Sequence, residues 1–497
     1  MMIFSFLDAS ADTSSLLIKD LGEGHCLVQI NTNQRYLLLP VEEVMPDVRV
    51  SMIVNNKEVK NFDVRLAIHK VDYFVPVDLS DYSGKLVSFK FKMNSNDPVR
   101  VNLSPDNTAC CREMKLSDTF DTTNREKFRP VYHFSPLYGW MNDPNGMVYK
   151  DGEYHLFYQH NPYGSKWGNM NWGHAISKDL INWEYRSDAI TPDAFGTIFS
   201  GSAVVDHNNT AGFGAGAIIA IYTQNGDRQV QSIAYSTDNG RTFTKYADNP
   251  VLVSEARDFR DPKVWYEEAD ETFYMILGAA VNGDPAMLLF HSADSENWTF
   301  HHVLYVAPAY FRENGGRCVE CPDFFCLDGV WVLIIGVVGY TEPVTGRHNL
   351  LFAQTGDFRD GYFIPSSHPL QMLDFGTDFY ALQTWGEEDA RTGFAWLYNW
   401  ATQKNVESSY CGEMSLPRRF HLNAQQQLCM TPVLPPESLV INQTRLADNE
   451  RWSSTEVNRA CTIAFTPTDA FCLTLSGDNG QEIVLEFDGK ALTLREK

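Results

Sequence analysis

The sequence predicts an all-β protein with a five-bladed β-propeller at its centre. Helical periodicity is almost absent from the chain. Short runs of β-branched and aromatic residues, such as residues 36–40, 153–158 and 330–335, alternate with clusters of Gly, Asn, Asp and Pro. This alternation is typical of many short strands joined by turns.

A weak repeat in the middle of the chain predicts the propeller. A Ser-x-Asp or Thr-x-Asp signal precedes an aromatic residue and recurs about every 60 residues, beginning at Ser177, Ser236, Ser292 and Thr355. Repeats of this length in an all-β chain indicate blades of four strands, and the nearly 300 residues of this region have room for about five. Each Asp would cap a turn, and each aromatic side chain would fill the gap between sheets. Alternatively, such turns recur by chance in any β protein.

The 497 residues exceed one typical core, and three regions differ in composition. Residues 1–125 alternate apolar and polar positions with frequent turn signals, which indicates an N-terminal β-sandwich-like module. Residues 130–425, rich in Trp, Tyr, Gly and Asn, would form the propeller. After a Pro-rich passage, residues 432–497 would form a short or truncated C-terminal β-sandwich segment.

The charge of the chain excludes some partners. The formal net charge is −23, so nucleic acid and anionic membranes would be repelled, whereas a neutral sugar would not. No apolar run approaches the roughly 18 residues that span a bilayer, so we expect no membrane insertion. The apolar first seven residues lack a basic segment, so we expect no signal peptide in this chain.

Ten cysteines are scattered along the chain. Cys318-x-x-Cys321 followed by Cys326 invites a zinc site, but a fourth ligand is not in the sequence pattern. Lone cysteines act more often as small buried apolar residues. We therefore expect no metal and no organic cofactor.

The densest group of polar and aromatic residues is the segment 138–146, Tyr-Gly-Trp-Met-Asn-Asp-Pro-Asn-Gly. Pro and Gly stiffen a turn that carries Asp143, and a rigidly held carboxylate has little entropy left to lose, as a nucleophile requires. Asp-Pro-Asn-Gly is also a common plain turn, because all four residues favour turns. The neighbours Trp140 and Asn142 favour function, since an aromatic ring beside amides commonly holds a sugar.

Two further carboxylates stand out. Asp261 follows Arg260, and the two could instead form an ion pair that holds a loop. Glu320 lies in an apolar, aromatic-rich run that would favour the protonated form a general acid needs, although a surface Glu at a strand end would look alike. Asp143, Asp261 and Glu320 are separated by 118 and 59 residues, in successive sections of the repeat. The innermost strands of a propeller would bring them to one axial funnel.

These segments resemble the three signature motifs of glycoside hydrolase family 32, the β-fructofuranosidases. The motifs are Trp-Met-Asn-Asp-Pro-Asn-Gly at 140–146, Arg-Asp-Pro at 260–262 and Glu-Cys-Pro-Asp at 320–323, and the resemblance covers roughly residues 130–425. It implies a five-bladed propeller followed by a β-sandwich. It also assigns the nucleophile to Asp143, the transition-state stabiliser to Asp261 and the acid/base to Glu320.

The resemblance extends to the fructose-binding subsite. The residues that should line it are Trp140, Asn142, Gln159, Trp167, Phe199, Ser200, Arg260 and Asp374. Amides, hydroxyls and Arg can bond to sugar hydroxyls, while aromatic rings cover the apolar face of the sugar. The N-terminal module lies outside the core family pattern, although similar modules precede the propeller in some bacterial members that degrade polysaccharides.

The activity that the resemblance implies is retaining hydrolysis through a fructosyl-enzyme. The expected partners are fructan (levan or inulin), fructo-oligosaccharide or sucrose, from which terminal β-D-fructose is released. Residues 197–206 look more like the levanase and exo-inulinase form of their motif than the plant invertase form, which favours terminal attack on fructans. An extracytoplasmic location, in the periplasm or at the cell surface, is implied by the resemblance alone. The preference for β-2,6 or β-2,1 linkages and the oligomeric state stay open.

Three alternative functions are compatible with parts of this pattern. An inverting five-bladed glycosidase that acts on arabinose or xylose chains also uses three carboxylates, although its motifs differ. A fructosyltransferase would use the same residues with a sugar acceptor in place of water. A sugar-binding protein on an inactive scaffold would not need all three carboxylates.

Overall fold

The computed structural model confirms an all-β protein. It describes residues 15–95, 103–123, 129–130, 132–387, 390–401, 408–434, 436, 443–453, 463, 466, 469–477 and 480–496. These residues form strands, two short α-helices, α1 (Ala109–Glu113) and α2 (Tyr310–Glu313), and two 3-10 turns, η1 (Ser80–Tyr82) and η2 (Pro105–Asn107). The chain divides into two compact units, Met1–Gln443 and Thr444–Lys497.

The N-terminal module consists of two antiparallel sheets. The larger sheet has the order β1 (Ser15–Gly22), β2 (His25–Asn31), β7 (Leu86–Lys92), β4 (Val48–Val54), β5 (Lys57–Val64), and the smaller has the order β6 (Tyr73–Asp78), β3 (Tyr36–Val41), β8 (Lys115–Ser117). Alternate side chains of the strands point inward, as Cys26, Val28 and Ile30 of β2 do. They form one core with residues of the smaller sheet, such as Leu37 and Val75. The two sheets therefore share one apolar core, as a sandwich-like module would.

Five further sheets follow in chain order. The first contains β9 (Gly139–Lys150), β10 (Glu153–Asn161), β11 (Asn171–Ser177) and β12 (Trp183–Ile190); the second contains β13 (Thr197–Asp206), β14 (Ala217–Asn225), β15 (Gln229–Ser236), β16 (Thr244–Lys245) and β17 (Leu252–Val253). The third contains β18 (Phe259–Glu267), β19 (Thr272–Val281), β20 (Asp284–Ser292) and β21 (Thr299–Val306). The fourth contains β22 (Cys318–Leu327), β23 (Val330–Val338), β24 (Leu351–Arg359), β25 (Tyr362–Pro365) and β26 (Gln371–Met372); the fifth contains β27 (Tyr380–Glu387), β28 (Ala390–Trp396), β30 (Arg418–Leu422) and β31 (Leu428–Pro432).

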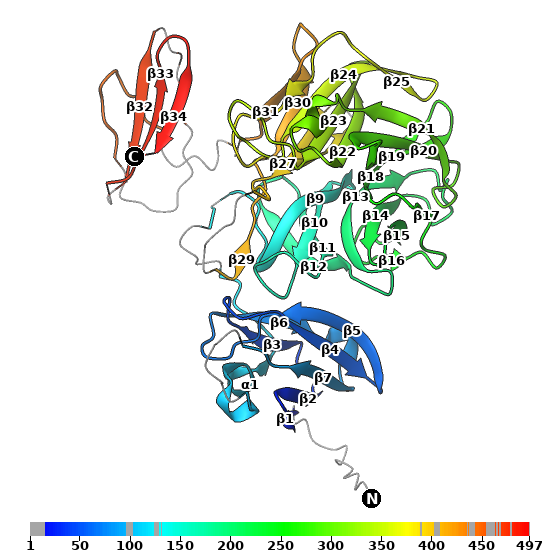
Figure 1. The fold of residues 1–497 in the computed structure, drawn as a ribbon, viewed down its shortest axis with the longest axis vertical. Coiled ribbons are helices and arrows are strands. Elements are labelled where there is room, and N and C mark those ends of the chain that lie inside the picture. Colours follow the sequence, from blue (N-terminus) through cyan, green and yellow to red (C-terminus); the bar gives the residue numbers. More distant parts are fainter. Residues whose placement is uncertain are drawn as a thin grey trace, which may run out of the picture. The chain divides into compact units, whose positions relative to one another are not determined.

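These sheets form a closed ring. Their first strands, β9, β13, β18, β22 and β27, contact one another in that order, and β27 contacts β9 again (Figure 1). Strand β29 (Tyr410–Cys411) pairs in parallel with β9, so a late segment of the chain completes the first sheet. Apolar clusters fill the gaps between neighbouring sheets, as where Ile219 and Ile221 of β14 pack with Met275 and Leu277 of β19. The propeller architecture is confirmed, with five sheets among the described residues.

The Ser-x-Asp signal forms the same turn in three sheets. In the first, Ser177 Oγ donates to Asp179 Oδ1 (3.1 Å), and Asp179 accepts the backbone N–H groups of residues 181 and 182. The serine and aspartate at 236 and 238 make the same bond, as do those at 292 and 294 (2.7 and 3.0 Å). Each turn joins the third strand of a sheet to the next strand, so the aspartates cap turns as predicted.

The aromatic residues after these turns also behave as predicted. Trp183, Phe243 and Trp298 each pack against a different apolar cluster of the ring. The fourth copy of the signal does not form the turn, because Asp357 lies within β24 and pairs with Arg359. The faint sequence echo at this position was therefore not a structural repeat.

The second unit is described by itself. Its described residues form one antiparallel sheet of three strands, β32 (Phe471–Ser476), β33 (Glu482–Phe487) and β34 (Leu492–Glu496). A C-terminal sandwich needs a second sheet, so that part of the prediction stays a prediction. The predicted domain limits also stay predictions, although the fifth sheet of the ring ends with β31 rather than at residue 425.

A buried ion pair joins three sheets of the ring. Asp323 of β22 is fully buried and lies 3.0 Å from the Nζ atom of Lys263 in β18. Its other carboxylate oxygen accepts the backbone N–H and the hydroxyl of Thr384 in β27 (2.7 and 2.6 Å). Lys263 in turn donates to the carbonyl oxygen of Thr384 (2.7 Å). Burial lowers the pKa of Lys263, and the charge of Asp323 opposes this shift.

The substitution Asp323→Ala is expected to destabilise the ring strongly. It leaves Lys263 buried without its carboxylate, and removal of one partner of a buried ion pair costs about 3–5 kcal/mol. The Tm of the first unit should fall well below that of the wild type in thermal unfolding. Glu255→Ala is the control, because this glutamate is 89% exposed and pairs with Arg228 at the surface; equal Tm values for the two variants would contradict the prediction.

Candidate active site

All five inner strands contain a β-bulge at corresponding positions. In each, two residues oppose one residue of the neighbouring strand, and the bulged pairs are 142–143 in β9, 199–200 in β13, 261–262 in β18, 321–322 in β22 and 381–382 in β27. A bulge bends the strand and redirects its side chains. Asp261 and Cys321 have positive φ angles (64° and 43°), which are uncommon for residues with a side chain and cluster at functional sites.

Proline lies at or next to three of these bulges. Pro144 follows Asp143, whereas Pro262 and Pro322 are the second residues of their bulges. Proline has no N–H to donate to the strand ladder, so within a sheet it is tolerated at such irregular positions. The Asp-Pro and Cys-Pro pairs of the sequence therefore lie at bulges within strands rather than in turns between strands.

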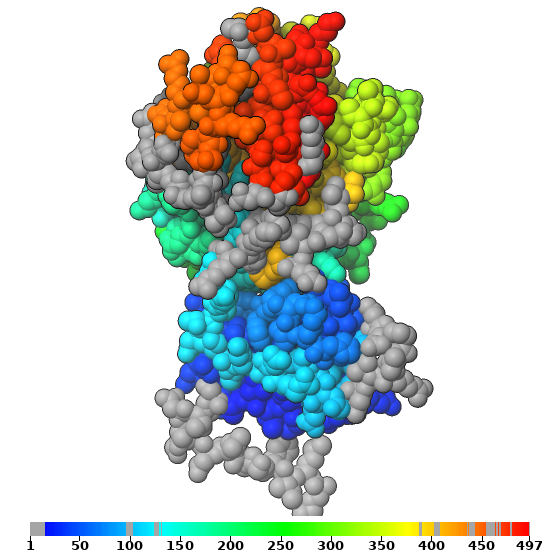
Figure 2. Space-filling model, turned by 90° about the vertical axis from the view of Figure 1, so that its left-hand side faces the viewer, coloured from blue at the N-terminus to red at the C-terminus, as the bar shows by residue number. Residues whose placement is uncertain are grey.

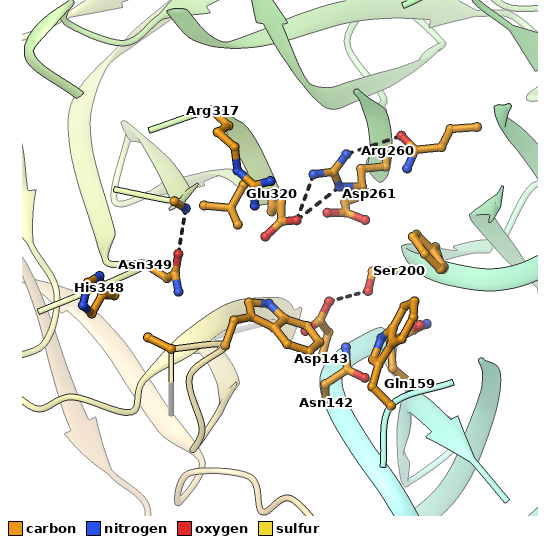
Figure 3. A pocket seen from close by; sticks show the side chains of 17 residues that line it. Asn142, Asp143, Gln159, Ser200, Arg260, Asp261, Arg317, Glu320, His348 and Asn349 are labelled. Atoms are coloured by element: carbon orange, nitrogen blue, oxygen red, sulfur yellow. Dashed lines mark hydrogen bonds and ion pairs between the residues drawn. The ribbon is translucent and has the colours of Figure 1, made fainter. Parts of the chain in front are cut away.

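Bulged residues of the first three sheets of the ring, Asn142, Asp143, Phe199, Ser200 and Asp261, line one cavity of about 710 Å³ (Figure 3). Nine of the eleven residues predicted for the site line it: Asn142, Asp143, Gln159, Trp167, Phe199, Ser200, Arg260, Asp261 and Glu320. The volume falls in the range of ordinary small-molecule sites. In Figure 3 the carboxylates of Glu320 and Asp261 face that of Asp143 across the pocket.

Asp143 is held by a hydroxyl and a thiol. Ser200 Oγ donates to Asp143 Oδ2 (2.6 Å), and Cys321 Sγ lies 3.3 Å from the same oxygen. Burial raises the pKa of Asp143, and the negative charge of Glu320 adds to the shift, while the hydrogen bonds from Ser200 and Asn142 oppose it. The arrangement fixes the orientation of this carboxylate and leaves it in a poorly solvated position.

Asp261 is almost completely buried. Its backbone N–H donates to Thr223 Oγ1 (3.0 Å), and its carboxylate accepts the backbone N–H of Cys321 (2.9 Å). Burial raises the pKa of Asp261 to about 7; Arg260 opposes the shift, and the charges of Glu320 and Asp143 add to it. Asp143 and Asp261 both contact Cys321, the residue next to Glu320, so the three carboxylates belong to one cluster.

Both carboxylate oxygens of Glu320 are bonded. Arg260 donates to Oε1 through Nη2 (2.9 Å) and Nε (3.3 Å), and the hydroxyl of Tyr380 donates to Oε2 (2.9 Å). Arg260 also bonds Asp258 through Nη1 (2.7 Å). The alternative of a simple Arg260–Asp261 ion pair in a loop is wrong, because Arg260 pairs with Glu320 and Asp258 instead.

Two predicted subsite residues do not line the cavity. Trp140 is buried, and its Nε1 donates to Asn142 Oδ1 (2.8 Å), so it supports Asn142 from behind rather than facing the cavity. Asp374 accepts the backbone N–H of Gly376 (2.7 Å), and its carbonyl oxygen accepts from Arg347. Its carboxylate is engaged in the turn that it begins.

The cavity is also lined by residues that were not predicted from the sequence. They are Gln229, Arg317, Val338, Gly339, His348, Asn349, Trp400 and Ala401. Most come from segments without a repeated or motif-like pattern, so no sequence signal distinguishes them. Trp400 is the exception, because it ends an aromatic-rich run, Trp-Leu-Tyr-Asn-Trp at 396–400, that could have been recognised.

Comparison with known families identifies the chain. The family described as "Glycosyl hydrolases family 32 N-terminal domain" matches residues 133–432, more than half of the chain. The chain belongs to glycosyl hydrolase family 32. The resemblance found in the sequence motifs is therefore confirmed. The N-terminal module of this family 32 chain matches a domain of unknown function (DUF4980) over residues 22–132.

Individual relatives of the family 32 chain include proteins named levanase and invertase. It is 41% identical over 356 residues to a levanase of Bacillus subtilis, covering 67% of this chain and 50% of the levanase. It is 35% identical over 397 residues to invertase 2 of Saccharomyces cerevisiae, covering 74% of this chain and 70% of the invertase. The chain thus spans half the length of this levanase.

Solved structures show the same fold. A fructofuranosidase from Schwanniomyces occidentalis complexed with fructose superposes with a TM-score of 0.62 at 31% identity, covering 74% of this chain and 80% of that one. The GH32 β-fructofuranosidase BmSUC1 of Bombyx mori superposes with a TM-score of 0.63 at 29% identity, covering 75% and 82%.

Metal ligands and membrane spans can also be considered for the part of the chain that the structure describes, namely its described residues. They contain no group of three or more His, Cys, Asp or Glu side chains that could hold a metal ion. Two of the three cysteines that suggested zinc have other neighbours, since Cys318 Sγ lies 2.9 Å from Arg260 Nη2 and Cys321 contacts two aspartates. No described helix has the length and apolar character needed to cross a bilayer.

The substitution Asp261→Asn is expected to stabilise the protein above neutral pH. The pKa of Asp261 is about 7 in the folded state, whereas an aspartate in an unfolded chain titrates near about 3.9. Between these pH values the folded state binds more protons, so this carboxyl group lowers stability as the pH rises from about 4 to about 7. The Tm of Asp261→Asn should exceed that of the wild type at pH 8 and approach it at pH 4; a Tm difference independent of pH would contradict the shift.

Proposed function

We propose that this chain is a retaining β-fructofuranosidase that releases terminal fructose from fructans and sucrose. The observation that carries the proposal is the convergence of Asp143, Asp261 and Glu320 on one cavity. Asp143 and Asp261 lie in the bulges of β9 and β18, and Glu320 directly precedes the bulge of β22. Membership of family 32 and relatives named levanase, invertase and exo-inulinase support it.

Asp143 is the proposed nucleophile. Its carboxylate oxygen attacks the anomeric carbon of the fructosyl unit, and the bond from that carbon to the leaving oxygen breaks. The bonds from Ser200 and Cys321 hold the carboxylate in one orientation, which lowers the entropy lost on reaching the transition state. Burial removes part of its hydration before the substrate arrives.

Glu320 is the proposed acid and base. It donates a proton to the leaving oxygen in the first step and accepts a proton from water in the second, when water displaces Asp143 and fructose is released. Arg260 and Tyr380 fix its two oxygens, and a bound leaving group would compete for one of these positions.

Asp261 is the proposed stabiliser of the transition state. It lies beside Asp143 and is linked to it through the thiol of Cys321, so its carboxylate can bond substrate hydroxyls near the reacting carbon. Charge that develops on the sugar ring in an oxocarbenium-like state would be stabilised by this poorly solvated carboxylate.

The remaining cavity residues provide a fructose subsite. Asn142, Gln159, Ser200 and Arg260 offer hydrogen-bonding groups, and Trp167 and Phe199 offer apolar faces, all on the cavity wall. Trp140 would act by holding Asn142, whereas Asp374 lies outside the cavity lining and has one carboxylate oxygen bonded to Gly376. Terminal attack on fructans is the preferred mode, because the motif at 197–206 looks like the levanase and exo-inulinase form.

Substitution of the two central carboxylates tests the proposal. Asp143→Asn should lower kcat on sucrose, levan and inulin by about 10⁴-fold or more, because no covalent intermediate can form. Glu320→Gln should lower kcat by about 10²–10⁴-fold on sucrose and by less on a substrate with an acidic leaving group, which needs less protonation. The readout is the steady-state rate of sugar release.

The matched control is Asp151→Asn, at the exposed turn after β9, which should keep the wild-type rate. If Asp143→Asn retained a tenth of the wild-type kcat, Asp143 would not be the nucleophile. Wild-type protein without activity on any fructan or sucrose would overturn the proposed function itself.

A further inference from the structure

The N-terminal module lies next to the propeller (Figure 1 and Figure 2). Hydrogen bonds join the module to the loop that carries Trp167. This loop, residues 162–170, connects β10 to β11. Trp167 lines the cavity yet is 49% exposed, and its ring contacts are edge contacts with Phe199 and Trp400 at centroid distances of 6.0 and 6.4 Å. These contacts alone give the indole little support.

The module holds the loop immediately before Trp167. Ser165 Oγ donates to Glu43 Oε1 (2.6 Å), and the backbone N–H of Ser165 donates to the hydroxyl of Tyr73 (3.1 Å). Lys166 Nζ donates to the carbonyl oxygen of Glu43 (3.1 Å). Three hydrogen bonds thus join two successive loop residues to the module.

The module also holds the loop on either side of this point. Asn169 exchanges two hydrogen bonds with the backbone of Asp63 in β5, each 2.8 Å long. Tyr163 stacks on Phe62 with ring centroids 3.9 Å apart. Contacts therefore precede and follow Trp167 within a few residues, which leaves the intervening backbone little freedom.

A buried ion pair anchors this contact within the module. Arg65 Nη2 lies 3.0 Å from Glu43 Oε2, and both side chains are largely buried. Burial opposes ionisation of Glu43, but Arg65 and the hydroxyls of Ser165 and Tyr73 outweigh it and hold the pKa of Glu43 below its ordinary value. A buried ion pair is weak evidence for stability by itself, whereas a role in fixing one arrangement is its best-attested use.

We propose that the N-terminal module is a positioning element for the active site: by gripping the loop 162–170 on both sides of Trp167, it fixes this indole at the wall of the cavity. The inference rests on the proposed function, in which Trp167 covers a face of the fructosyl unit. It gives the domain of unknown function at residues 22–132 a role in the substrate affinity of the neighbouring propeller.

Independent sugar binding by the module is less well supported. Tyr36, Tyr73, Phe74 and Tyr82 are aromatic residues of the module, and all four are half-buried. The hydroxyl of Tyr73 bonds to Glu43, and Tyr36 makes an edge contact with Phe120. The contacts of the module that reach the site pass through the loop.

A double-mutant cycle tests the proposal. Tyr73→Phe with Ser165→Ala removes hydroxyl bonds between module and loop but leaves the ion pair of Glu43 and Arg65 in place. One lost bond is to the charged Glu43 carboxylate and the other is to the hydroxyl of Tyr73, so kcat/KM on sucrose should fall about tenfold, mostly through KM. In a Trp167→Ala background the same pair of changes should lower kcat/KM by less than about twofold, because their effect passes through Trp167.

The matched control is Ser83→Ala, which removes a serine hydroxyl that bonds Asn33 within the module (3.0 Å). Its kcat/KM should equal that of the wild type. An equal loss of kcat/KM with and without Trp167, or no loss in either background, would overturn the proposal.

Hydrogen–deuterium exchange gives a readout that does not need activity. Peptides covering 162–170 should exchange faster in the Tyr73→Phe, Ser165→Ala protein than in the wild type or the control. Unchanged exchange in this loop would overturn the positioning role even if the enzyme is active. Faster exchange in a protein with no activity on sucrose or fructans would keep the positioning role and remove only the proposed function.

Discussion

The carboxylate of Asp323 is the contact on which the rest of the site depends. It lies in the interior of β22, three residues after Glu320, and binds Lys263 of β18 and Thr384 of β27. Because three inner strands are joined through this one carboxylate, their positions along the axis of the ring are fixed relative to one another. Gln383 extends the network, since its amide donates to the carbonyl oxygens of Cys321 and Pro322 in the bulge (both 3.1 Å). The polar core thus fixes the backbone that carries Glu320 and Cys321.

The bulges convert this fixed ring into a cavity with convergent carboxylates. A regular strand would alternate its side chains between two faces, whereas two residues opposing one change the direction of the chain and turn Asp143, Asp261 and the Glu320–Cys321 pair toward the axis. Three carboxylates close together in a poorly solvated place are unfavourable when all are charged. The raised pKa values of Asp143 and Asp261 reflect this cost. Strained backbone and unfavourable charge at one place are typical of sites where function opposes stability.

Much of the fold and most of the site followed from the sequence, and the exceptions have physical causes. Turns such as Ser177-x-Asp179 depend on hydrogen bonds between residues that are close in sequence, so the sequence pattern could reveal them. The repeat of these turns also predicted the ring. Trp140 and Asp374 were placed on the cavity wall by resemblance, but their positions depend on contacts with Asn142 and Gly376 that spacing does not encode. Arg317 and His348 were missed because loops between strands bring them to the cavity. The hydrogen bond between the N-terminal module and Ser165 was not predictable either, since it joins segments more than a hundred residues apart.

The anomeric form of the first sugar released tests the central claim most directly. A fructosyl-enzyme on Asp143 inverts the anomeric centre once, and attack by water from the opposite side inverts it again. Early-time NMR of sucrose hydrolysis by the wild-type protein should therefore show β-fructofuranose before mutarotation begins. Initial release of the α-anomer would mean a single displacement by water, and Asp143 would then act as a general base rather than as a nucleophile.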